Sequence, residues 1–103
     1  MSDMKAVEKK DRYLLTVTDA CLKYAPMLKD WSFQRVTDSW FSDDVVADFY
    51  QNADTGRCAI LHLTWRELRL CGQDTEKMHR VVYFKMRIMA ELAGIEIAEH
   101  EHV

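Results

Sequence analysis

The spacing of apolar residues changes along the chain and divides it into segments. From Asp11 onward, apolar residues recur every three or four positions, which is the spacing of one face of a helix. These positions are Leu14, Val17, Cys21, Tyr24 and Leu28. Pro26 lacks an amide proton and its ring clashes with the preceding turn, so we place the end of this helix near Tyr24 or Ala25. Residues 1–10 are polar and either fray or extend the helix.

Three segments typical of strands follow. Residues 33–40 are rich in β-branched and aromatic types. Residues 44–51 alternate, with Val45, Ala47 and Phe49 on one side, and residues 57–64 alternate in the same way. Residues 52–56 have the composition of a turn. We therefore predict three strands, the last two of which form a hairpin.

The remainder of the chain predicts a second long helix. Asp74 or Thr75 can cap its start, and Gly94 can end it after about Ala93. Residues 65–71 are ambiguous, because Thr64 and Glu67 match a capping box while alternating leucines fit a continued strand. Residues 95–98 alternate and could add a short edge strand.

The order of these segments is α-β-β-β-α, possibly with a short final β. Consecutive strands with short turns give an antiparallel sheet. We therefore predict one α+β domain over residues 1–103, with a sheet of three to four strands flanked by an N-terminal and a C-terminal helix.

The C-terminal helix has a wide apolar arc. Its members are Met78, Val81, Val82, Met86, Ile88, Met89, Leu92 and Ala93. Because the arc is wider than an ordinary surface helix needs, we expect it to meet a second surface, either the first helix or another copy of the chain. We predict a homodimer that uses this helix. The residues assigned to self-association are Met78, Val82, Lys85, Met86 and Met89.

Charge and composition narrow the classes of partner. The chain has 103 residues and a net charge of −3, and phosphate binding needs a cationic surface, so we expect no nucleic-acid partner. No apolar run approaches the ~20 residues of a membrane span, so we expect no membrane partner. Residues Met1–Lys5 are polar and lack an apolar signal core, so the sequence gives no argument for export. Three cysteines without CxxC spacing predict reduced thiols in a cytoplasmic protein.

The segment 31–50 combines aromatic residues with aspartates. Not all of its aromatic rings fit inside a domain of this size. Exposed aromatic side chains supply binding energy, and neighbouring charges orient the partner. We assign partner binding to Trp40, Phe41, Asp43, Asp44, Asp48 and Tyr50.

Candidate chemical groups are few. Asp48 and His62 share a predicted sheet face and become cross-strand neighbours in one possible register, with Cys58 nearby as a possible nucleophile. His100 and His102 alone are too few to hold a metal ion, because a site needs at least three protein ligands. We expect no catalytic residue, no metal and no cofactor.

Three functions fit these observations. The first is a non-catalytic protein-binding or regulatory module, similar to an inhibitor, which self-associates through the C-terminal helix. The alternative is a small-ligand-binding domain or small enzyme, with a pocket between sheet and helices near His62, Asp48 and Cys58. The third is a structural subunit of a larger assembly.

Overall fold

Three α-helices and three strands make up the part of the chain that the computed structural model describes. That part comprises residues 10–38, 42–52 and 56–98, together with the backbone of residues 2–9. The elements are α1 (Ser2–Tyr24), η1 (Ala25–Met27), β1 (Trp31–Asp38), β2 (Asp44–Gln51), β3 (Cys58–Thr64), α2 (Trp65–Cys71) and α3 (Thr75–Ala93). The predicted α+β class and the predicted order are confirmed, with α2 inserted before the last helix. None of the described helices is long and apolar enough to cross a membrane.

The sheet is antiparallel and has the strand order β1-β2-β3. The predicted hairpin forms from β2 and β3, with Val45 opposite Leu63 and Phe49 opposite Ala59. β1 begins at Trp31, two residues before its predicted start, and its register shifts between Phe33 and Arg35. This shift is a β-bulge, in which one extra residue interrupts the ladder and bends the strand.

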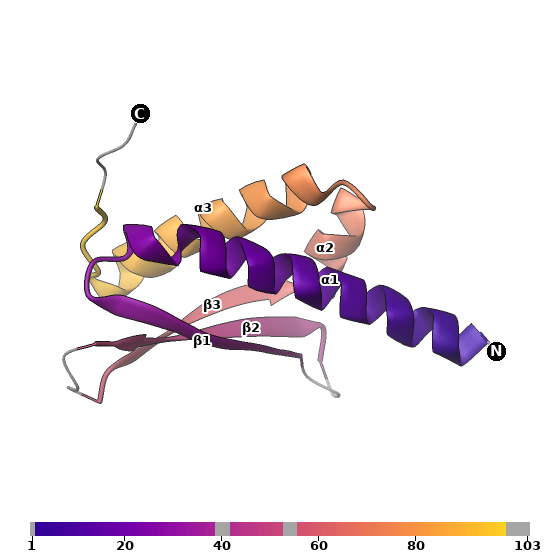
Figure 1. Cartoon of the computed structure of the whole chain (residues 1–103), viewed down its shortest axis with the longest axis horizontal. Coiled ribbons are helices and arrows are strands. Elements are labelled where there is room, and N and C mark those ends of the chain that lie inside the picture. The colour runs from indigo at the N-terminus through magenta and orange to yellow at the C-terminus, as the bar shows by residue number, and fades with distance from the viewer. Residues whose placement is uncertain (1, 39–41, 53–55, 99–103) are drawn as a thin grey trace.

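Helices cover one face of this sheet (Figure 1). α1 packs over β1, α3 packs over β3, and the two helices also pack against each other. The core between the two layers includes Val17 from α1, Phe49 from β2, Leu61 from β3 and Met86 from α3, all of which are fully buried. No described helix lies on the opposite face of the sheet (Figure 1), so the molecule has two layers.

Residues 65–71 form a helix, which resolves the ambiguity of this segment. The Thr64 hydroxyl accepts a hydrogen bond from the Glu67 amide at 3.1 Å, and the Glu67 carboxylate accepts one from the Thr64 amide at 2.9 Å. This capping box satisfies two amides at the start of α2. Thr64 is therefore both the last residue of β3 and the cap of α2, so no loop separates the two elements.

α3 starts and ends at the capping residues that the sequence indicated. The Asp74 side chain accepts a hydrogen bond from the Lys77 amide, and Gly94 ends the helix in the left-handed conformation at φ 70°. The tail that follows forms an isolated antiparallel bridge between Ile97 and Leu28. It pairs with the connection before β1 and adds no further strand to the sheet.

Candidate functional site

The sheet face that no helix covers is the first candidate site, and we call it the open sheet face. Its side chains alternate along the strands with those of the core. They include Arg35, Asp44, Val46, Asp48, Tyr50, Cys58, Ile60 and His62. Among the large apolar side chains of this face, Tyr50 and Ile60 are the most exposed, at 41% and 49%.

The register arranges these side chains in rows across the three strands. Tyr50 lies between Ser32 and Cys58, while Asp48 lies between Arg35 and Ile60. Tyr50 and Ile60 are therefore diagonal neighbours, a relation that brings side chains of this size into reach of each other. The open sheet face thus has an apolar centre on β2 and β3, bordered by charged residues.

Two side-chain pairs border this apolar centre: an ion pair between Arg35 and Asp48, and a contact between the His62 imidazole and the Asp44 carboxylate. Arg35 Nε lies 3.2 Å from Asp48 Oδ2, and His62 Nε2 lies 2.7 Å from Asp44 Oδ1. The Ser42 hydroxyl also donates a hydrogen bond to Asp44 Oδ2 at 2.7 Å. The Ser42 hydrogen bond and the neighbouring His62 imidazole together lower the pKa of Asp44. Asp44 is therefore ionised at neutral pH and adds negative charge to the open sheet face.

The strands do not adopt the register that would make Asp48 and His62 cross-strand neighbours. The register places His62 opposite Val46 and Asp48 opposite Ile60, so His62 pairs with Asp44 instead. Cys58 precedes His62 by four residues on the same strand, a separation of about 13 Å. All three predicted groups lie on the face without helices, so they cannot line a pocket between the sheet and the helices.

Three of the six residues predicted to bind a partner lie together on the open sheet face, namely Asp44, Asp48 and Tyr50. Asp43 instead holds the start of α2, because its carboxylate accepts a hydrogen bond from the Arg66 amide at 3.2 Å and its carbonyl accepts one from the Trp65 amide at 2.8 Å. Trp40 and Phe41 lie outside the described residues.

Four of the five residues predicted for self-association are covered by the chain itself. Met78, Val82, Met86 and Met89 are at most 5% exposed. The reason is that α1 lies beside α3 while the sheet lies beneath it, so together they cover more of the helix than the sheet alone would. Lys85 forms a 2.7 Å ion pair with Glu67 of α2 in the same chain. A self-association surface on α3 must therefore use other residues.

The exposed apolar residues of α3 form a separate stripe, which we call the outer α3 stripe and define as Phe84, Ile88 and Leu92. They are 60%, 53% and 84% exposed. A spacing of four places them along one line of the helix. Ile88 and Leu92 belong to the predicted apolar arc, whereas Phe84 was not assigned to it. The buried residues Met78, Val82, Met86 and Ala90 have the same spacing of four, so spacing alone does not distinguish this line from the buried side of the helix.

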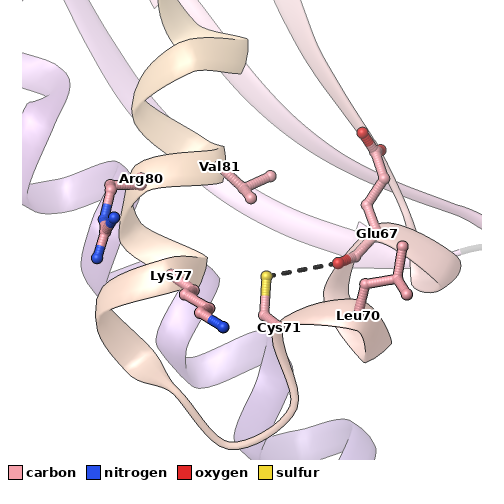
Figure 2. A pocket seen from close by; sticks show the side chains of 6 residues that line it. All are labelled: Glu67, Leu70, Cys71, Lys77, Arg80 and Val81. Carbon is pink, nitrogen blue, oxygen red and sulfur yellow. Dashed lines mark hydrogen bonds between the residues drawn. The ribbon is translucent and has the colours of Figure 1, made fainter.

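A shallow depression of about 320 Å³ lies between α2 and α3 (Figure 2). Its lining includes Cys71, whose thiol donates a hydrogen bond to the backbone carbonyl of Glu67 at 3.4 Å, while the Glu67 carboxylate points away from the thiol (Figure 2). Burial raises the pKa of the Cys71 thiol. Because the thiolate is the reactive form, this cysteine is a poor nucleophile at neutral pH.

The described residues also include neither a reactive core cysteine nor a metal-binding cluster. Burial raises the pKa of the Cys21 thiol to about 12, so this core cysteine is unreactive. Among the described residues, no group of three His, Cys, Asp or Glu side chains could hold a metal ion. His100 and His102 lie outside the described residues.

No family model matches the chain, and comparison with curated proteins and with solved structures finds no significant match. The open sheet face and the outer α3 stripe each bring exposed apolar side chains together on one surface.

Proposed function

We propose that the chain is a non-catalytic, regulatory protein-binding module, similar in use to an inhibitor, and that the open sheet face is its binding surface. The observation that carries this proposal is the position of Tyr50 and Ile60, two exposed side chains that are neighbours on a sheet face without helices. An antiparallel sheet with one face in water normally carries polar residues on that face. Tyr is also enriched among the residues that dominate the energy of protein interfaces.

The charges of the open sheet face suggest the chemistry of the partner. Asp44 and Asp48 contribute two carboxylates beside the apolar centre, and Arg35 neutralises one of them. The whole chain is acidic as well, with a net charge of −3. Complementary charge increases the association rate and fixes orientation, whereas the apolar contact supplies most of the affinity. The partner we propose is a protein segment that presents lysine or arginine beside aliphatic side chains.

Selection from a random peptide library on the immobilised chain tests this function. We expect the enriched peptides to combine basic and aliphatic residues. Their affinity for a Tyr50→Ala variant should fall at least about tenfold, the effect typical of an interface hot spot. The control is Leu15→Ala, which removes a more exposed apolar side chain from α1 (63% exposed, against 41% for Tyr50) and should leave binding unchanged.

Two results would reject this function. One is a selection in which no peptide is enriched above an unrelated protein of similar charge. The other is a set of peptides that bind Tyr50→Ala as tightly as the unchanged chain, because such peptides would use a different surface.

We place this function in the cytoplasm. Cys21, Cys58 and Cys71 are all free, and Cys58 is exposed. Exposed free thiols are readily oxidised in secretory compartments, whereas cytoplasmic reductants keep them reduced. Alkylation of the chain in intact cells should therefore label Cys58 without prior reduction, and a disulfide-linked form under the same conditions would contradict this location.

A further inference from the structure

The edge strand β3 lacks the features that normally keep a sheet edge from pairing. Within the described residues no further strand pairs with β3, and its register with β2 is unbroken over seven residues. Its sequence, CAILHLT, contains no Lys, Arg, Asp, Glu or Pro. Natural edge strands are usually protected by such residues or by a bulge. β1, at the other edge, has both a bulge and Arg35.

The outer α3 stripe lies on the same side of the molecule as this edge. His79 and Tyr83 mark the side of α3 that faces α1, because their rings lie 6.1 Å and 5.2 Å from the ring of Tyr24. At about 100° per residue, the outer α3 stripe is roughly half a turn away from that side. Because α1 packs over β1 and α3 over β3, the stripe faces outward beyond the free edge of β3.

We propose that these two features together bind a second copy of the chain. In the resulting dimer, β3 pairs antiparallel with β3 of the second copy, and α3 packs against α3 of the second copy around a two-fold axis. The two three-stranded sheets then form one continuous sheet. The open sheet face takes no part in this contact, so the dimer is a property beyond the proposed binding function.

The two-fold symmetry of this dimer would bring opposite charges beside the stripe together. Arg80 and Glu91 are exposed on the same flank of α3, and within the described part of the chain neither forms an ion pair. When two antiparallel helices are related by an axis near residue 86, position 84 meets position 88 of the second copy. The same axis brings Arg80 close to Glu91 of the second copy, twice per dimer. A surface that pairs with itself in this way is typical of two-fold interfaces.

The exposed apolar area of the outer α3 stripe is too small to form a stable dimer interface without the edge of β3. Three large side chains that are more than half exposed offer on the order of 300 Å² of apolar surface. A stable interface buries about 800 Å² on each partner. The stripe alone therefore falls short, and the backbone of β3 has to be part of the interface.

Sedimentation velocity of the full chain over a concentration series tests the dimer. We expect the mass of a dimer at micromolar concentration. Ile88→Glu places a charge at the centre of the stripe and should weaken self-association at least about a hundredfold. The matched control is Leu22→Glu, which introduces the same charge at an exposed position of α1 (58% exposed) and should leave the dimer intact. Circular dichroism of both variants confirms that they fold.

A charge exchange tests whether the partner is a second copy. Arg80→Glu and Glu91→Arg should each weaken the dimer about fivefold, and the double variant should restore it, because the two charges then meet with reversed signs. Amide hydrogen exchange tests the strand edge, since the β3 amides that point away from β2 should be protected in the dimer and exchange faster in Ile88→Glu.

A monomer at ~100 µM would overturn the proposal, as would a dimer that Ile88→Glu leaves intact. A dimer in which the outer amides of β3 stay unprotected would overturn the pairing of the strands. These results are independent of the peptide-binding test, because Tyr50→Ala should weaken peptide binding and leave the dimer unchanged.

Discussion

The two faces of the sheet are made by alternate residues of the same strands, yet they have different properties. Phe49 is fully buried beneath the helices, while the next residue, Tyr50, is 41% exposed on the open sheet face. Apart from Gln51 at the end of β2, the covered face is apolar on β2 and β3, whereas the open face mixes apolar side chains with paired charged and polar side chains. From this difference we expect the covered face to contribute most of the stability, and substitutions on the open face to cost little.

The largest expected effect on stability comes from comparing a substitution on the covered face with one at the next residue, on the open face. Phe49→Ala removes a ring from the core and leaves a cavity, so the free energy of unfolding should fall by about 3–5 kcal/mol. Tyr50→Ala should change it by less than about 1 kcal/mol, because the ring is partly exposed and no buried cavity forms. Urea unfolding measures both values. Similar losses in the two variants would show that the open face also carries stability.

A second substitution tests Thr64, an open-face residue whose side chain stabilises the start of α2 by a hydrogen bond to a backbone amide. Thr64 lies in line with the open-face residues of β3, but its hydroxyl caps α2. Thr64→Ala should therefore lower the free energy of unfolding by about 1 kcal/mol, the usual effect of losing a helix cap. Thr64→Ser keeps the hydroxyl and should retain most of the stability. An equal loss in both variants would mean that the methyl group, rather than the cap, is responsible.

The pH dependence of stability should come from Glu67 more than from Asp44. Partial burial raises the pKa of Glu67, but hydrogen bonds from Lys85 and from the Thr64 backbone outweigh it, so the pKa lies below its ordinary value of 4.5. A carboxylate with a lowered pKa stabilises the fold above the unfolded-state pKa, and this contribution is lost as the pH falls through the folded-state pKa.

Chemical unfolding between pH 7 and pH 3 measures this contribution. Below pH 4.5 the unchanged chain should lose stability more steeply than Glu67→Gln, which has no carboxylate to protonate. Asp44→Asn should alter the slope less, since Asp44 is on an exposed strand end. A steeper acid loss in Glu67→Gln than in the unchanged chain would contradict the assignment.

The smallest effect on stability is expected for the ion pair on the open sheet face. Arg35 is 70% exposed, so Arg35→Ala should change the free energy of unfolding by at most ~0.5 kcal/mol. The same substitution frees Asp48 and should increase the association rate of the basic peptides selected above, an increase that added salt removes. Stopped-flow binding measures this rate, and a decrease would show that Arg35 itself contacts the peptide.

Local patterns predicted the elements well. The hairpin of β2 and β3 and the two caps of α3 depend on neighbouring residues, and the structure has them where the sequence indicated. Residues 65–71 are too short to show helical periodicity, so the helix was indicated by its two ends, the capping box of Thr64 and Glu67 and the glycine at position 72.

Long-range contacts were not visible in the sequence. The register that joins Asp48 to Ile60 differs by two residues from the one that would join it to His62, and the alternation of the strands fits both. A helical wheel shows how wide the apolar arc of α3 is, but not that α1 covers one side of it. For that reason the sequence assigns self-association to methionines that the structure buries, whereas the exposed Phe84 lies outside the predicted arc.

The bulge between Phe33 and Arg35 has a consequence for the size of any assembly. A sheet with two regular free edges can add copies at both ends and grow into a filament. Because the bulge distorts β1, only β3 offers a straight edge, and two copies joined there leave no second straight edge for growth. Gln34 is the extra residue of this bulge. Deleting it would straighten β1 and keep Phe33 and Val36 on the core side, so β1 would become a second regular edge. In the dimer that we propose, the distortion in β1 would therefore limit growth to a closed pair.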